Sequence, residues 1–244
     1  MNREPSTALS ILVPCFNEEA NIAALVARTR AVLEGMDLAW EIVLVDDGSA
    51  DRTQEKIQAE AAADARVIGV FHEHNRGIVA GWVSGLEKSR GAFVLPLDAD
   101  LQYRPEDVPQ LWAAQAETGA DLVQGARISS PEHDPGRHLA TQMFCWLLNF
   151  LFGMDLKDNK SGFILYRREA MARIMAEREG FRLFQHFVAV AAHAQGYKIA
   201  EVPVAFDPRR AGKSFIGNVL FFALRAFLDF PLAVRRFRGK KRSP

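Results

Sequence analysis

The sequence feature that most constrains the fold is an alternation of short apolar segments with helix-like segments in the N-terminal part of the chain. Four apolar runs have the length of buried strands, and they occupy residues 9–13, 41–45, 67–71 and 93–97. Segments of helical character separate them, at residues 21–33, 51–61 and 78–89. Strand and helix alternating at this rhythm predict a doubly wound, mostly parallel sheet with right-handed crossovers. The sequence therefore predicts an α/β fold.

Acidic residues follow three of these apolar runs. They are Glu18 and Glu19, Asp46 and Asp47, and Asp98 and Asp100. The carboxyl ends of parallel strands share one edge of a sheet, where open α/β sheets bind their ligands, so we expect the acids to converge there. Converging carboxylates repel one another unless a cation or the donors of a ligand compensate them. In the alternative, each acid begins or caps a helix, which explains Ser49 and Asp51 well and the Asp46–Asp47 pair poorly.

The turn after the fourth run is the candidate metal site. Asp98 and Asp100 stand one residue apart, and Gln102 adds a neutral oxygen from the same turn. Such a set holds one divalent cation and leaves positions for substrate phosphates, which Mg²⁺ favours. The alternative is an acidic strand-to-helix turn in which Asp100 caps a helix near Pro105. An Asp-x-Asp motif is common, so its place after a buried strand is what supports the metal.

Composition narrows the class of protein. The 244 residues suit one α/β domain, and 49% hydrophobic and 25% charged residues are typical of a globular protein with a core. Thirty basic and thirty acidic residues give no net charge, so we expect no nucleic acid partner. The two cysteines indicate no disulfide framework and a reducing compartment. The polar N-terminus does not resemble a signal peptide, and we expect a cytoplasmic protein.

Seven ordered segments resemble one known family. They are residues 11–19, 45–53, 74–77, 97–102, 125–127, 158–163 and 201–204. In this order they resemble the family 2 glycosyltransferases, and more narrowly the polyprenyl-phosphate (dolichol-phosphate) mannosyl- and glucosyltransferases. The resemblance implies a nucleotide-sugar-binding, Rossmann-like fold of the GT-A type. It also implies a divalent cation, Mg²⁺ or Mn²⁺, and inversion at the anomeric carbon of the transferred sugar.

The resemblance also assigns residues to roles. The residues expected at the nucleotide are Pro14, Phe16, Glu18, Asp46 and Asp47, with Arg76 at the donor phosphates. Asp98, Asp100 and Gln102 are expected to hold the metal on the diphosphate. Arg127 is expected to face the transferred sugar or the acceptor phosphate, with a surface ion pair as the alternative. Asp158 is the candidate base for an alcohol acceptor, and otherwise braces the turn at Ser161.

The expected reaction is transfer of a hexose, mannose or glucose, from GDP-mannose or UDP-glucose to a polyprenyl phosphate. An acceptor phosphate is already anionic and needs little general base, so cations that position it matter most. The acceptor-binding candidates are Arg137, Ser161, Arg209, Lys213 and Ser214. Residues 209–215 resemble the family's Arg-x-x-Gly-x-Ser-Lys loop, but Phe215 replaces its lysine and leaves the acceptor in question. Alternatives are a non-lipid hydroxyl acceptor and a binding module without catalysis.

Two long apolar segments, 139–154 and 215–234, point to a membrane surface. The second is interrupted by Arg225, Asp229 and Pro231 and is followed by a tail with six basic residues. We therefore expect a catalytic domain at 1–214, and a membrane-interface helix with a basic tail at 215–244. Neither segment should span the bilayer, so the protein would associate peripherally with the cytoplasmic face. Burial of such a helix in a soluble core is the alternative.

Overall fold

The computed structural model describes residues 7–127, 135–208 and 219–239, and the side chains of 135–140 and 219–227 are not described. The described strands form a seven-stranded sheet in the order β3-β2-β1-β4-β6-β5-β7. They are β1 (Leu9–Cys15), β2 (Trp40–Asp46), β3 (Val67–Phe71), β4 (Phe93–Pro96), β5 (Leu122–Arg127), β6 (Ile164–Arg167) and β7 (Ile199–Val204). β6 is antiparallel to both its neighbours, and the remaining strands are parallel. The predicted doubly wound, mostly parallel sheet is confirmed.

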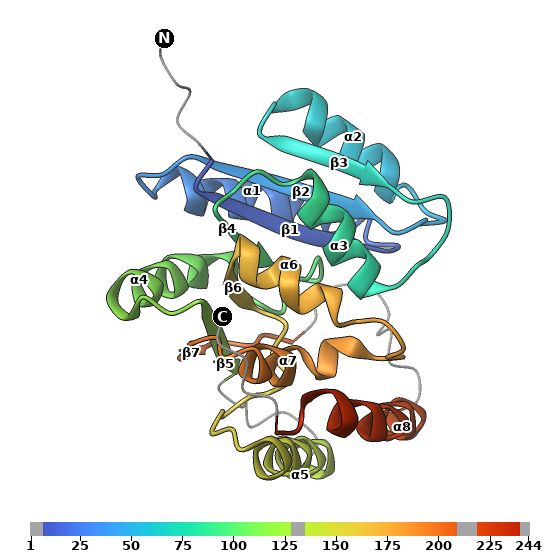
Figure 1. The fold of residues 1–244 in the computed structure, drawn as a ribbon. Helices are drawn as coiled ribbons and strands as arrows, with labels where there is room; N and C mark the ends of the chain where they lie inside the picture. Colours follow the sequence, from blue (N-terminus) through green and yellow to red (C-terminus); the bar gives the residue numbers. More distant parts are fainter. Residues whose placement is uncertain (1–6, 128–134, 209–218, 240–244) are drawn as a thin grey trace.

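Helices cover both faces of this sheet (Figure 1). They are α1 (Ile22–Glu34), α2 (Thr53–Ala63), α3 (Ile78–Lys88), α4 (Val108–Thr118), α5 (Pro135–Phe152), α6 (Arg168–Ala176), α7 (Val188–Ala194) and α8 (Val219–Phe237), with short 3₁₀ helices η1 (Pro105–Asp107) and η2 (Phe184–His186). One hydrophobic core lies beneath α1, α2 and α4, and a second lies beneath α3, α5, α6, α7 and α8. All seven residues of β2 are buried between two helical layers, and the apolar run 42–45 lies between the buried acids Glu41 and Asp46.

Glycine allows α3 to approach the sheet closely. A Cβ atom on Gly81 would lie 2.9 Å from Cβ of Pro14, so the helix rests directly on the end of β1. Gly77 precedes the helix with φ of 87°, a conformation open to glycine and rarely to other residues. The small residues of α3 therefore fix where the loop before it, residues 72–77, meets the ends of β1 and β2.

The C-terminal part of α8 is built into the core. Phe230, Ala233 and Phe237 are buried in the same cluster as α6 and α7. The buried carboxylate of Asp229 accepts hydrogen bonds from the backbone N–H groups of Arg182 (2.9 Å) and Leu183 (2.8 Å). The alternative of core burial therefore describes this half of the helix. The division of the chain at residue 214 stays a prediction, although truncation there would remove core residues.

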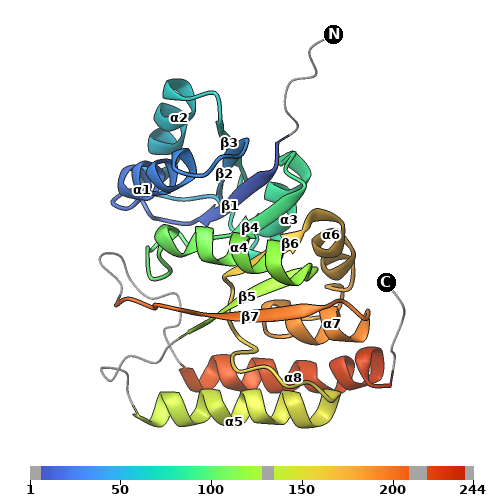
Figure 2. The same ribbon diagram turned by 90° about the vertical axis from the view of Figure 1, so that its left-hand side faces the viewer.

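α5 and α8 lie side by side along one end of the molecule (Figure 2). Within the described segments, no helix has both the length and the hydropathy needed to cross a bilayer.

Candidate active site

The catalytic candidates lie along one edge of the sheet. The carboxyl ends of the parallel strands β1, β2, β4, β5 and β7 share this edge. β6 runs in the opposite direction, so the segment that precedes it, residues 158–163, reaches the same edge. The turns after β1, β2 and β4 and the loop before β6 therefore surround one region, as expected for ligand binding in an α/β sheet.

The three acidic pairs follow strands that end at this edge, where the sequence analysis expected them, and they divide between two parts of it. β2 and β4 flank β1 on opposite sides, so Asp46 and Asp98 are separated by two strand spacings, about 10 Å. Among the described residues, no three His, Cys, Asp or Glu side chains lie close enough to hold a metal together. The acids therefore form two parts of the site, one at the ends of β1 and β2 and the other after β4.

The loops after β1 and β2 are joined by hydrogen bonds. The N–H of Asn17 donates to Oγ of Ser49 (2.9 Å), and the N–H of Glu18 donates to Oγ1 of Thr53 (2.8 Å). Asp51 accepts from the N–H of Thr53 (3.0 Å) at the first residue of α2, although the N-cap position is Arg52 and not Asp51 as the capping alternative expected. Asn17 has φ of 55°, a conformation that costs a non-glycine residue about 1 kcal/mol or more. The predicted nucleotide-binding segment that includes Pro14, Phe16 and Glu18 is thus held in one conformation.

Asp47 is bound by the protein itself. Its side chain is buried, and Oδ1 lies 2.7 Å from Nδ1 of His72 and accepts from the N–H of Arg76 (2.9 Å). Oδ2 accepts from the N–H of Gly77 (2.8 Å), and Nε2 of His72 lies 2.9 Å from Oγ of Ser84. Asp47 therefore fastens the 72–77 loop to the end of β2 and holds the exposed Arg76 at the site edge. The role of Asp47 at the nucleotide stays a prediction. Asp47 would act there through the 72–77 loop that it holds in place.

Asp46 and Gly48 complete this part of the site. The buried carboxylate of Asp46 accepts from the N–H of Ser49 (3.2 Å). A Cβ atom on Gly48 would lie 2.6 Å from Cα of His74, so only glycine lets the two loops meet this closely. The sequence indicated the acidic pair but gave no sign of His72 as its partner, because no local pattern links residues so far apart.

The turn after β4 has the oxygen donors that a divalent cation needs. Asp100 is buried and accepts from the N–H of Gln102 (3.1 Å), and Asp98 is half-buried. Leu101, between Asp100 and Gln102, has φ of 59° and a buried side chain, so packing in the core maintains a strained turn. Two carboxylates and an amide oxygen on one turn fit Mg²⁺ or Mn²⁺, which prefer such ligands.

Arg127 and Asp158 lie together as a bidentate ion pair. Nε and Nη2 of Arg127 donate to the carboxylate at 2.6 and 2.9 Å, and the backbone N–H of Arg127 lies 3.3 Å from it. Burial favours the neutral form of Asp158, but the hydrogen bonds and charge of Arg127 offset this and lower its pKa. Asp158 is therefore a weak base. The ion pair is largely buried, unlike the surface pair of the alternative, and the role of Arg127 at the acceptor phosphate stays a prediction.

An aromatic cluster that the sequence did not indicate lies beside this ion pair. Tyr103 stacks on Phe163, with ring centroids 5.0 Å apart, and meets the edge of Phe206 at 4.9 Å. The hydroxyl groups of Tyr103 and Ser161 lie 3.1 Å apart, and burial raises the pKa of Tyr103 to about 12. Ser161, an acceptor candidate, is therefore buried and hydrogen-bonded. The side chain of Arg137, together with Arg209, Lys213 and Ser214, lies outside the described part of the structure.

α5 is hydrogen-bonded to the loop that carries Asp158. Nδ2 of Asn149 donates to the carbonyl of Leu156 (2.9 Å). Nδ2 of Asn159 donates to Oδ1 of Asn149 (2.9 Å) and to the carbonyl of Cys145 (3.1 Å). These bonds fix the helix to the edge of the candidate site.

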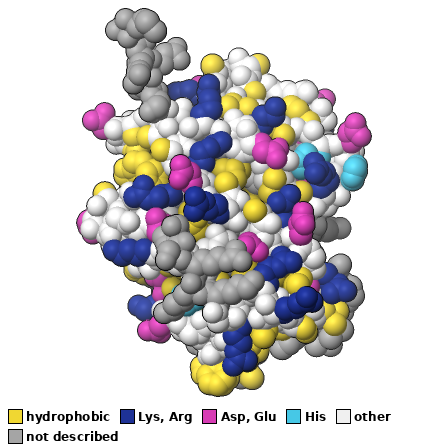
Figure 3. Space-filling model, in the orientation of Figure 1, with side chains coloured by type: hydrophobic (Ala, Val, Ile, Leu, Met, Phe, Trp, Pro, Cys, Tyr) yellow, Lys and Arg dark blue, Asp and Glu magenta, His cyan; other side chains and the backbone are white. Residues whose placement is uncertain are grey.

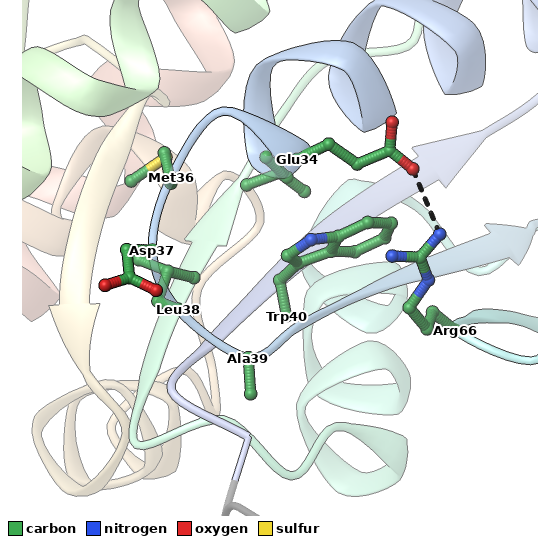
Figure 4. Close-up of a pocket in the computed structure, with 8 residues that line it drawn as sticks. Glu34, Met36, Asp37, Leu38, Ala39, Trp40 and Arg66 are labelled. Atoms are coloured by element: carbon green, nitrogen blue, oxygen red, sulfur yellow. Dashed lines mark hydrogen bonds and ion pairs between the residues drawn. The ribbon is translucent and has the colours of Figure 1, made fainter.

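A pocket beside Trp40 lies away from these residues (Figure 4). Trp40 is the first residue of β2, so the pocket is at the amino end of the strand that carries Asp46 at its carboxyl end. Arg66 lies over the Trp40 ring, 3.9 Å from its centroid, and donates to Glu34 (3.2 Å). The guanidinium of Arg66 already occupies the face of the Trp40 ring. We therefore interpret this pocket as local packing between α1 and the residue before β3.

Comparison with known proteins places this geometry in a family. Residues 10–181 match the family described as Glycosyl transferase family 2. A curated relative, the undecaprenyl-phosphate 4-deoxy-4-formamido-L-arabinose transferase of Pseudomonas paraeruginosa, is 34% identical over 98% of this chain and 70% of its own length.

Solved glycosyltransferase structures share the fold. Mannosyl-3-phosphoglycerate synthase from Rubrobacter xylanophilus gives a TM-score of 0.66 at 19% identity, covering 94% of this chain and 74% of that one. A mannosyltransferase from Pyrobaculum calidifontis in complex with GDP-Man and Mn²⁺ gives 0.64 at 17% identity, covering 100% and 68%. The fold is therefore the GT-A fold that the family resemblance implied. With a family match over most of its length and a relative at 34% identity, the chain belongs to glycosyl transferase family 2 and is a glycosyltransferase.

Proposed function

We propose that this glycosyltransferase moves a sugar from a nucleotide diphosphate sugar to a polyprenyl phosphate, with inversion at the anomeric carbon. The observation that carries the proposal is the Arg127–Asp158 ion pair, which lies near Tyr103 in the segment that follows Asp98 and Asp100. Because Arg127 lowers the pKa of Asp158, the carboxylate is poorly suited to take a proton from an alcohol. A phosphate acceptor is already ionised and needs no such base. The curated relative is named for transfer to undecaprenyl phosphate, which supports the same acceptor.

Different residues of the site would bind the donor, the cation and the acceptor. The ends of β1 and β2 would hold the nucleotide, through Asp46 and the loop that Asp47 fastens. Asp98, Asp100 and Gln102 would hold the cation, which when bound neutralises the leaving diphosphate as a Lewis acid. Arg127 would orient the acceptor phosphate at the edge between these parts. Electrostatic positioning therefore supplies most of the proposed catalysis.

The identity of the donor sugar and of its nucleotide is the second part of the proposed function. GDP-mannose and UDP-glucose are the donors that the sequence resemblance implies, and the transferred group would then be a hexose. The curated relative is named for a 4-deoxy-4-formamido-L-arabinose, so a nucleotide-linked form of that sugar belongs in the same comparison. A thermal-shift screen with Mn²⁺ separates them, because a ligand at 100 times its Kd adds about 2.7 kcal/mol to stability.

A transfer assay with matched acceptors tests the proposed reaction. The enzyme is incubated with each donor, Mg²⁺ or Mn²⁺, and either undecaprenyl phosphate or undecaprenol. We expect lipid-linked sugar from the phosphate only, because the alcohol must lose a proton that Asp158 is poorly placed to accept. Equal transfer to the alcohol would show a different acceptor chemistry. Donor binding with neither transfer nor hydrolysis would instead favour a binding module.

The exposed face of α5 supports the proposed membrane surface. Met143, Trp146 and Phe150 are 63%, 65% and 71% exposed and recur at helical spacing along this face. The rings of Trp146 and Phe150 stack with their centroids 5.5 Å apart. Hydrophobic side chains also gather at the lowest point of the surface in Figure 3, which has the orientation of Figure 1, where α5 lies. We propose that this face contacts the cytoplasmic leaflet, since aromatic side chains partition into the interface.

Liposome flotation with charge substitutions on α5 tests the membrane proposal. Trp146→Glu with Phe150→Glu should abolish flotation of the full chain with anionic liposomes, because both apolar anchors become charged. Gln54→Glu with Gln58→Glu is the matched control, since it adds the same charge to exposed positions of α2 and should float normally. Undiminished flotation of the α5 variant in 1 M salt would contradict the proposal.

A further inference from the structure

The segment that follows β7 is fastened to the turn that follows the metal candidates. The backbone N–H of Asp207 donates to the carbonyl of Gln102 (2.9 Å). Tyr103 and Phe206 form an antiparallel β-bridge, and their rings meet edge to face at 4.9 Å. Residues 102–104 and 206–207 are therefore paired through backbone and side chains, although more than a hundred positions separate them in the sequence.

Asp207 acts on Gln102 through its backbone and on Arg104 through its side chain. The carbonyl oxygen of Asp207 lies 3.1 Å from the side-chain nitrogen of Gln102. A carbonyl only accepts hydrogen bonds, so this contact determines which end of the amide faces Asp207. Oε1 of Gln102 is therefore at the other end of the amide, away from the carbonyl. The carboxylate of Asp207 binds the guanidinium of Arg104 at 2.8 and 2.5 Å.

We propose that Arg104 and Asp207 are positioning residues that present the amide oxygen of Gln102 to the cation. This inference rests on the proposed function, in which Asp98, Asp100 and Gln102 hold the metal. Neither Arg104 nor Asp207 would be a ligand of the cation, since their side chains bind each other. Their bidentate ion pair fixes the segment whose carbonyl orients the Gln102 amide. Groups that orient a metal ligand commonly change metal affinity by about 10- to 100-fold when they are removed.

The expected effect lies at the lower end of that range. Arg104 and Asp207 are 45% and 23% exposed, so solvent weakens the ion pair. The backbone bonds between Gln102 and Asp207 also remain when the carboxylate is lost. Asp207→Asn should therefore weaken Mn²⁺ binding about tenfold. Arg104→Gln removes the other half of the same pair and should have a similar effect.

Mn²⁺ binding to the full chain, followed by electron paramagnetic resonance, tests this inference. Wild-type protein, Asp207→Asn and Arg104→Gln are titrated with Mn²⁺ alone, and circular dichroism checks that each remains folded. Asp64→Asn is the matched control, because Asp64 forms a comparable pair with Arg66 at the opposite edge of the sheet. We expect weaker binding in the first two variants and wild-type affinity in the control.

A double-variant cycle shows whether the effect passes through Gln102. In a Gln102→Ala background, Asp207→Asn should cause no further loss of Mn²⁺ affinity, because the ligand that it orients is gone. An equal loss in both backgrounds would overturn the inference, and so would wild-type affinity in the single Asp207→Asn variant. Both results leave the proposed function standing. Wild-type protein that binds no Mn²⁺ would overturn the inference and the proposed metal role together.

Discussion

Asp100→Asn is expected to lower the rate of sugar transfer by at least about a thousandfold while the protein remains folded. The lost carboxylate would hold the cation that stabilises the leaving diphosphate, and about 4 kcal/mol of such stabilisation corresponds to this factor. Asparagine retains the shape of the side chain and an oxygen that accepts from the N–H of Gln102, so the turn should persist. Turnover with the preferred donor, measured beside the circular dichroism spectrum, checks both parts.

Asp37→Asn is the matched control for this substitution. Asp37 is exposed and precedes β2 at the opposite edge of the sheet, so its loss should leave turnover unchanged. Full activity of Asp100→Asn, or full activity of the wild-type enzyme in excess chelator, would falsify the metal assignment.

Asp47→Ala is expected to raise the KM for the donor more than tenfold while kcat falls less. Removal of the carboxylate frees the 72–77 loop and the exposed Arg76, which acts on the donor in the proposed function. The change also removes the acceptor of three part-buried hydrogen bonds, each worth about 1 kcal/mol, so the free energy of unfolding should fall by about 3 kcal/mol. Steady-state kinetics and urea unfolding measure the two effects.

His72→Gln tests the effect of loosening the 72–77 loop without removing the charge of Asp47. This variant keeps Asp47 and its bonds to the N–H groups of Arg76 and Gly77, and loses the contacts of the imidazole to Asp47 and Ser84. We expect a smaller rise in donor KM than in Asp47→Ala, in the same direction. An equal fall in kcat and kcat/KM for Asp47→Ala, with KM unchanged, would place Asp47 in the chemical step instead.

The strands and the acids that follow them could be predicted because both are local properties of the sequence. The apolar runs specify buried strands, and the parallel arrangement then places Asp46 and Asp98 on one edge. Strand order was not available from the sequence, because it depends on pairing between distant segments. This order places Asp46 and Asp98 on opposite sides of β1, a separation that the sequence did not specify.

The hydrogen-bonding partners of the candidate residues could not be predicted from the sequence either, because they also lie in distant segments of the chain. Asp47 meets His72 and Asp158 meets Arg127 across intervening helices or strands. The position of α8 could not be predicted for a different reason. An apolar helix suits a protein core and a membrane interface alike, and only its contacts, such as Asp229 with residues 182–183, distinguish them.

The hydrogen bonds of Asn149 have a consequence for the height at which sugar is transferred. They join α5 to the loop of Asp158, so a surface that holds the helix also sets the position of the reacting groups. The chain between Phe152 and Asp158 spans at most about 20 Å. If α5 lies on the bilayer as proposed, a lipid phosphate would need to rise no farther than this from the plane of the helix. The distance between the bilayer and the reacting groups would then be set by a hydrogen-bonded part of the fold rather than by a flexible tether.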